Sequence, residues 1–149
     1  MNVDTLLEFR SNVQRFIRIF GLLEQNVTPC GFPLSVSQVY AMQELENTMM
    51  SVTELAQRLH LERSSVSRLV DGLVKENLIN RDINEVNRRE MVLSLTEKGA
   101  QTIQQIREQS ISFYQSVLGD LPDNDQTFII EGFKKFTVAL LQYRGKQND

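Results

Sequence analysis

The chain has 149 residues, 41% of them hydrophobic and 23% charged, which is the composition of a folded domain and excludes a disordered chain. Sixteen Lys and Arg residues against 19 Asp and Glu residues give a formal charge of −3, so a nucleic-acid surface needs local clustering of cations. A single cysteine excludes an internal disulfide. Together with a single histidine it is too little for a metal site of ordinary spacing, and we expect no metal and no cofactor.

The N-terminal segment predicts one long helix, from about residue 4 to residue 23. Its apolar residues recur at intervals of three and four, in the order Leu6, Phe9, Val13, Phe16, Phe20 and Leu23. Further apolar residues lie beside this seam, so we expect the helix to pack against more than one partner. The next segment, 25–34, contains Pro29, Gly31 and Pro33 and is a connector in which a helix cannot continue.

Two capping boxes mark helix starts in the middle of the chain. Ser35 with Gln38 begins one helix, and Ser51 with Glu54 begins another. The second of these helices ends near His60, a residue that tolerates a positive φ, and a third helix follows after a tight corner. That third helix has one apolar stripe at helical spacing, formed by Val66, Leu69, Val70, Leu73 and Val74.

The opposite face of the third helix begins with arginines and small hydroxyl residues. They are Arg63, Ser64, Ser65, Ser67 and Arg68. In a helix-turn-helix unit, such a start enters the major groove of DNA, where serine reaches base edges or phosphates and arginine pairs with guanine. An ordinary solvated helical hairpin is the alternative interpretation of this helix alone.

A two-stranded ribbon is predicted directly after the third helix. Asn77 stands where the helix ends and is one of the few residue types other than glycine that accept the left-handed cap conformation. Segments 78–83 and 91–95 have the pattern of strands. The polar loop between them carries Arg88 and Arg89, and guanidinium groups suit the narrow minor groove. A ribbon in this place is a wing, and it favours DNA binding.

Two more helices are predicted after the ribbon, one opened by Thr96 and one following Pro122. The last helix carries a second apolar stripe, formed by Ile129, Phe133, Phe136, Leu140 and Tyr143. Because a winged helix has its own core, we expect the terminal helices to form an interface between two copies of the chain. The residues expected in this interface are Leu6, Phe9, Val13, Phe16, Ile129, Phe133, Phe136 and Leu140. A larger monomeric helical core is the alternative.

The order and spacing of these elements resemble the MarR family of bacterial winged-helix regulators. The matching residues are Leu55-Ala56-x-x-Leu59, Val66-Ser67-Arg68-Leu69-Val70-Asp71-x-Leu73, Leu78-Ile79-x-Arg81, Asn87-Arg88-Arg89 and Leu95-Thr96-x-x-Gly99. The chain departs from the family pattern at two positions. Asn87 stands where relatives usually carry Asp, so an ion pair that braces the wing is weakened or replaced, and Asn77 stands where relatives usually carry Gly.

The resemblance implies a mainly α fold with a small β-wing, in one MarR-like domain over residues 1–149. Within it, a winged helix-turn-helix at about 34–99 is flanked by dimerisation helices at about 1–25 and 100–145. It further implies a bacterial, sequence-specific DNA-binding transcriptional regulator. We expect a ligand- or stress-responsive repressor that binds a pseudo-palindromic operator as a homodimer. Its effector is expected to be a small phenolic or other aromatic molecule, at an unknown site.

The residues expected to contact DNA come from the start of the second capped helix, from the third helix and from the ribbon. They are Ser51, Thr53, Arg63, Ser64, Ser65, Ser67, Arg68, Arg81, Arg88 and Arg89. Segment 51–99 holds eight basic and eight acidic residues, so the basic cluster depends on the acidic side chains pointing elsewhere. We expect this of Glu54, Asp71 and Glu76.

The remaining expectations concern other functions and location. We find no glycine-rich phosphate loop and no nucleophile motif, so we expect no enzymatic activity. Two alternatives stay open: a redox-responsive regulator acting through Cys30, and a winged-helix protein-interaction module that does not bind DNA. No apolar run approaches membrane-spanning length and the start of the sequence lacks a signal-peptide pattern, which predicts a cytoplasmic protein without membrane contact.

Overall fold

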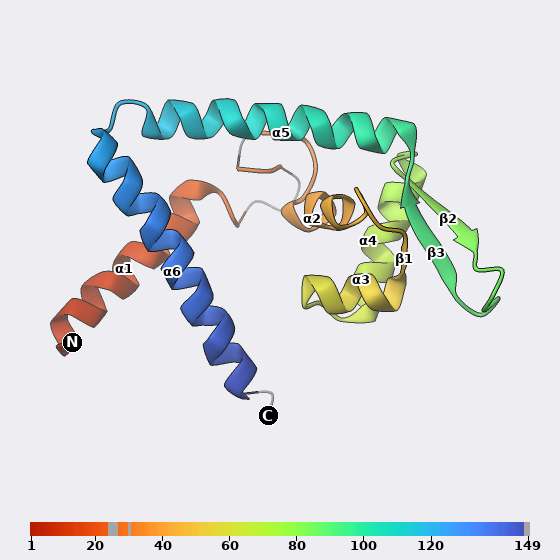
Figure 1. Ribbon diagram of the computed structural model, residues 1–149, viewed down its shortest axis with the longest axis horizontal. Coiled ribbons are helices and arrows are strands. Elements are labelled where there is room, and N and C mark those ends of the chain that lie inside the picture. Colours follow the sequence, from red (N-terminus) through yellow and green to blue (C-terminus); the bar gives the residue numbers. More distant parts are fainter. Residues whose placement is uncertain (24–26, 30, 148–149) are drawn as a thin grey trace. The chain divides into compact units, whose positions relative to one another are not determined.

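The computed structural model describes residues 1–23, 27–29 and 31–147, which divide into two compact units at residues 1–110 and 111–149. Cys30, on which the redox alternative depends, lies outside the described residues. Figure 1 shows the helices and the small sheet along the chain. Their order is α1 (Val3–Phe20), α2 (Val36–Glu44), β1 (Met50–Ser51), α3 (Val52–Leu59), α4 (Arg63–Lys75), β2 (Ile79–Ile83), β3 (Met91–Leu95), α5 (Glu97–Leu118) and α6 (Asp123–Gln147).

Helix α1 ends three residues before the predicted end. Asn2 caps its start by accepting the Thr5 amide at 2.8 Å. At the other end Gly21 adopts the left-handed conformation, with φ 86°, and its amide donates to the Ile17 carbonyl. A left-handed glycine terminates a helix, whereas the apolar repeat by itself continues to residue 23.

The core of the first unit lies between helices α2, α3 and α4 and the sheet, with two residues from the start of α5. Val66, Val70 and Leu73 on α4 are fully buried, while Leu69 and Val74 are half-buried, which confirms the predicted stripe. The other buried apolar residues are Val39, Ala41, Met42, Leu45, Met50, Leu55, Ala56, Leu78, Ile79, Leu93, Ile103 and Ile106. Apart from Ile103 and Ile106, this core belongs to the winged helix itself.

The sheet has three antiparallel strands in the order β1-β3-β2. Strands β2 and β3 pair over five residues, with Arg81 opposite Leu93, and form the predicted wing. Strand β1 was not predicted, because two residues, Met50 and Ser51, are too few to show alternation. The expected fold, mainly α with a small β-wing, is confirmed.

A set of polar contacts joins the end of α4 to the start of α5. The hydroxyl of Thr96 donates to the Asn77 carbonyl at 2.7 Å and accepts the Gly99 amide at 2.8 Å, so Thr96 caps α5 as predicted. Lys98 donates to the Glu76 carbonyl at 2.8 Å. Gly99 packs directly against the backbone at Leu78. The start of α5 is therefore attached to the end of α4.

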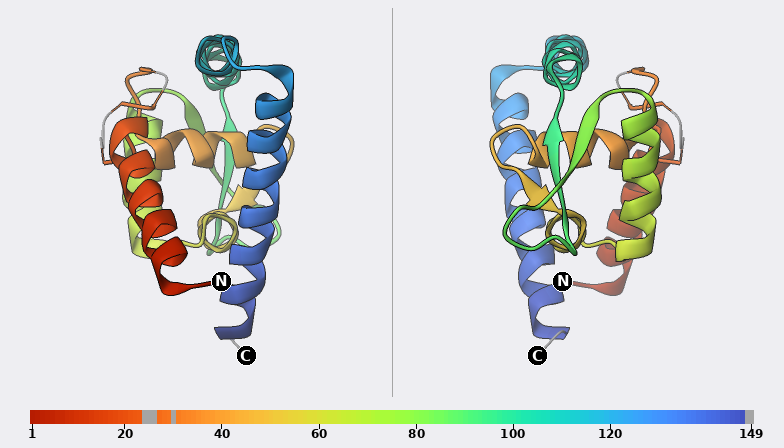
Figure 2. Two further views of the ribbon diagram at one scale, coloured as in Figure 1. Left: turned by 90° about the vertical axis from the view of Figure 1, so that its left-hand side faces the viewer. Right: turned by 90° about the vertical axis from the view of Figure 1, so that its right-hand side faces the viewer.

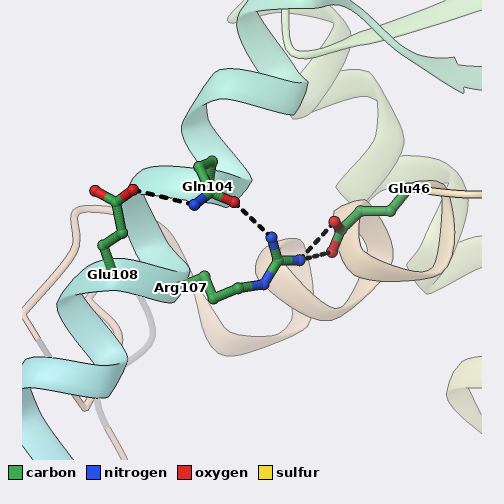
Figure 3. A network of polar contacts seen from close by, with 4 residues as sticks. All are labelled: Glu46, Gln104, Arg107 and Glu108. Atoms are coloured by element: carbon green, nitrogen blue, oxygen red, sulfur yellow. Dashed lines mark hydrogen bonds and ion pairs between the residues drawn. The ribbon is translucent and has the colours of Figure 1, made fainter.

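A second polar network holds α5 to the segment that follows α2 (Figure 3). Arg107 donates to both carboxylate oxygens of Glu46, at 2.7 and 2.5 Å, and to the Gln104 side chain at 2.7 Å. Gln104 in turn donates to Glu108 at 3.0 Å. Within residues 1–110, α5 thus contacts the winged helix at both of these places. No helix in the described ranges is both long enough and apolar enough to cross a membrane.

Candidate nucleic-acid interface

Helices α3 and α4 form the helix-turn-helix, and two left-handed residues set its geometry. His60 ends α3 with φ 54°, and its amide donates to the Ala56 carbonyl. Asn77, with φ 58°, turns the chain from α4 into β2. Both conformations were predicted from the residue types. Glu62 stands at the N-cap of α4 without a side-chain hydrogen bond at the cap, so the first turn of α4 presents backbone N–H groups at the positive end of the helix.

A groove of about 430 Å³ lies at the start of α4, beside the wing. The wing and α4 lie on the same side of the first unit, which faces the viewer in the right-hand panel of Figure 2. The lining residues come from α3, α4, β2, the wing loop and β3, and they are Val52, Arg63, Ser64, Ser67, Arg81, Arg89 and Met91. Five of these seven were predicted to bind DNA. The fold therefore brings three arginines and two serines from distant parts of the sequence to one groove.

The other five predicted DNA-binding residues do not line this groove. Arg68, Arg88 and Thr53 have exposed side chains, and Ser65 is half-buried. The hydroxyl of Ser51 accepts the Glu54 amide at 3.1 Å and so serves as a helix cap. A contact of any of these residues with DNA stays a prediction.

The five predicted arginines differ in their ion pairing. Within the part of the chain that the structure describes, Arg63, Arg68, Arg88 and Arg89 form no ion pair. Arg81 differs, because its Nη1 lies 2.6 Å from a carboxylate oxygen of Asp71. The expectation that Asp71 points away from the basic cluster was wrong, since the side chains of α4 and β2 meet across the edge of the groove.

The capping box predicted at the start of α3 is only half formed. Ser51 caps the helix, but the Glu54 carboxylate lies 3.5 Å from Arg58 on the next turn, where it forms an ion pair. Arg58 also pairs with Glu44, at 3.4 Å. Glu54 therefore points away from the groove as expected.

The wing loop is closed by two asparagine side chains. The side-chain oxygen of Asn84 accepts hydrogen bonds from the backbone N–H groups of Val86 and Asn87, at 3.0 and 3.2 Å. The backbone N–H of Asn84 donates to the Glu90 carbonyl at 3.1 Å. Asn87, which replaces the usual Asp, accepts the Arg89 amide at 3.3 Å. An amide oxygen thus shapes the turn that presents Arg89, without a charge that competes for its guanidinium group.

Sequence reasoning missed three residues of this site. Val52 and Met91 provide apolar lining, and Asp71 pairs with a lining residue. Val52 follows directly after the capping serine, and Met91 opens the second wing strand, so only the folded topology brings them together. The described residues contain no group of three or more His, Cys, Asp or Glu side chains that could hold a metal ion.

Comparison with known proteins relates this site to a family. The family model described as MarR family matches residues 34–91, which include the helix-turn-helix and the wing as far as the start of β3. Over these residues the chain is similar to the MarR family. MarR family members are transcriptional regulators and not enzymes. The match contains every residue that lines the groove.

Two individual relatives are similar to part of the chain. The chain is 34% identical over 77 residues to the HTH-type transcriptional repressor MdtR of Bacillus subtilis, which covers 51% of this chain and 45% of that protein. It is 23% identical over 82 residues to the repressor YetL of the same organism, covering 55% and 49%. The chain thus matches about half the length of these curated relatives.

The fold similarity is broader than the sequence similarity. The crystal structure of AbsC, a MarR family transcriptional regulator from Streptomyces coelicolor, superposes with a TM-score of 0.70 over 95% of this chain and 97% of that one, at 20% identity. Similarity at this level of identity shows a common fold.

Proposed function

We propose that this chain is a sequence-specific DNA-binding transcriptional repressor that reads a pseudo-palindromic operator as a homodimer. The observation that carries the proposal is the groove beside α4, which Arg63, Arg89, Ser64 and Ser67 line together. The MarR family match over the same residues supports it. The relatives MdtR and YetL are named as repressors.

The groove suits DNA because each of its groups matches one part of a duplex. Helix α4 places the exposed Ser64 and Arg68 opposite the buried Val66 and Val70, with the half-buried Ser67 beside them, as a helix that enters a major groove requires. Arg89 projects from the wing, where it reaches the minor groove. Arg63 and the open N–H groups of the first turn of α4 bind phosphate.

The proposed complex depends on few charges. The whole chain carries a formal charge of −3, so binding to DNA outside the operator is weak, and specific binding rests on a handful of phosphate contacts. If the chain were instead a protein-interaction module, no DNA affinity that falls with rising salt concentration would be measured.

The dimer is proposed from the two helices at the ends of the chain. No residue of α1 or α6, both of which the structure describes in full, is buried, although each helix carries a long apolar stripe. Leu6 on α1 is 49% exposed, and Leu140 on α6 is 46% exposed. Exposed apolar surface of this extent marks an interaction site. MarR family regulators bind DNA as dimers, which supports a two-fold assembly with two α4 helices about 10 bp apart on DNA. A small aromatic effector also stays a prediction.

Replacing Arg89 with alanine is expected to weaken binding to every DNA sequence. The wing would lose a minor-groove cation, so the slope of log affinity against log salt should become shallower by about 0.9. Fluorescence anisotropy with a 30-bp duplex at four salt concentrations measures both quantities. Arg144→Ala, which removes the same charge from α6, is the matched control and should leave the slope unchanged. A salt-independent affinity of the unmodified protein would overturn the proposed function.

A further inference from the structure

We propose that the Asp71–Arg81 ion pair is a clamp that fixes the wing to helix α4, and that Arg81 is a positioning residue and not a phosphate-binding cation. This inference rests on the proposed function, because the geometry that the clamp maintains is that of a DNA-reading surface. It changes the role of Arg81, which the sequence places among the DNA-contacting arginines.

The clamp joins helix α4 to strand β2 at a place where β2 contributes no side chain to the apolar core. Along β2 only Ile79 is buried, and the four following residues, 80–83, are exposed. Beyond Ile79, therefore, no buried side chain of β2 anchors the wing. Arg81 lies in the middle of this exposed stretch, opposite Leu93, and its Nη1 donates to Oδ1 of Asp71 at 2.6 Å. This distance is slightly shorter than is usual for a charge-assisted hydrogen bond between a guanidinium group and a carboxylate.

The position of Asp71 makes the bond relevant to the groove. Asp71 follows Ser67 by four residues and Ser64 by seven, so the three side chains lie along one face of α4. Arg81 lines the groove together with Ser64 and Ser67. The ion pair thus sets the distance between the DNA-reading face of α4 and the strand that carries the wing.

The charge of Arg81 is compensated within the protein. The side chains of Arg81 and Asp71 are 33% and 51% exposed, so they move to the DNA surface together as a neutral pair. A neutral pair releases no counterion when DNA binds, whereas Arg63 and Arg89 each have no ion pair within the described ranges.

The test uses the charge-neutral double variant D71N/R81Q, with D71N alone as a second variant. In the absence of DNA, hydrogen exchange of the backbone amides in segment 81–91 reports on the clamp directly. Exchange should become about two- to fivefold faster in both variants, as expected for loss of a partly exposed ion pair. The control E44Q/R58Q removes the ion pairs of Arg58 with Glu44 and Glu54, which are of similar exposure, and should leave this segment unchanged.

DNA binding then separates positioning from charge. The probes are the best duplex from a random-pool selection and a shuffled duplex of the same composition. D71N/R81Q should lower affinity for the selected duplex about two- to fivefold while keeping the salt slope of the unmodified protein. D71N should make the slope steeper, because Arg81 becomes an unpaired cation.

Two results would overturn the clamp: unchanged exchange in segment 81–91, or a slope that becomes shallower by about one in D71N/R81Q, which would make Arg81 a phosphate-binding cation. If the unmodified protein binds neither duplex, the proposed function fails. The exchange measurement alone then decides whether the clamp exists.

Discussion

Gly99→Ala is expected to lower the free energy of unfolding by about 2–3 kcal/mol, with a reduced urea midpoint. A Cβ atom at Gly99 would overlap the Leu78 carbonyl oxygen and lie 3.3 Å from Cδ2 of Leu95. The obstructing oxygen belongs to the backbone where α4 leads into β2, so it cannot swing away like a side chain. The start of α5 must shift instead, which strains the Thr96 hydrogen bonds to Asn77 and Gly99.

Gly145→Ala on α6 is the matched control, because Gly145 lies on the side of the helix away from Leu140. A Cβ atom there would meet nothing within 4 Å, and the residue lies inside a helix. Alanine should therefore raise stability by about 0.5–1 kcal/mol through helix propensity. Urea titrations at one fixed protein concentration measure both variants. If Gly99→Ala is as stable as the unmodified protein, the close packing of α5 on Leu78 is not part of the fold in solution.

Leu140→Glu is expected to convert the dimer into monomers and to lower affinity for a two-site operator at least about 100-fold. A carboxylate in an apolar interface loses its hydration without a partner, and one subunit alone binds only one half-site. Light scattering measures the mass, and anisotropy with the operator duplex measures the affinity.

The control for this change is Gln142→Glu, which adds the same charge on the opposite side of α6. It should leave both the mass and the affinity unchanged. An unaltered mass for Leu140→Glu would contradict the proposed interface. Monomers that still bind the operator with full affinity would contradict the two-fold reading of DNA.

Local features of the sequence predicted most of the winged helix. The Ser35–Gln38 capping box forms as expected, with bonds of 3.0 and 3.1 Å, because both partners lie within one helical turn. His60 and Asn77 adopt the positive φ that both residue types tolerate more readily than most. These interactions involve residues a few positions apart, so their spacing in the sequence is sufficient to identify them.

The features that sequence reasoning missed depend on distant partners. Strand β1 exists because Met50 and Ser51 pair with residues of β3, far along the chain. The Asp71–Arg81 pair requires the chain to turn back at Asn77 before the two side chains meet. The same holds for the apolar residues that line the groove. A periodic pattern in the sequence does not show which distant residues come into contact. The arginines and serines of the groove could be predicted because their residue type and their position on a predicted helix or loop were sufficient.

Selection of bound duplexes from a random DNA pool tests the central claim most directly, because the protein itself chooses the operator from all sequences present. Enrichment of two inverted half-sites with centres about 10 bp apart is the predicted result, reflecting two α4 helices in successive major grooves. An Arg68→Ala protein selected in parallel should enrich the same spacing with relaxed preference within each half-site. A pool that shows no enrichment above a protein-free control would contradict the assignment of this groove to DNA.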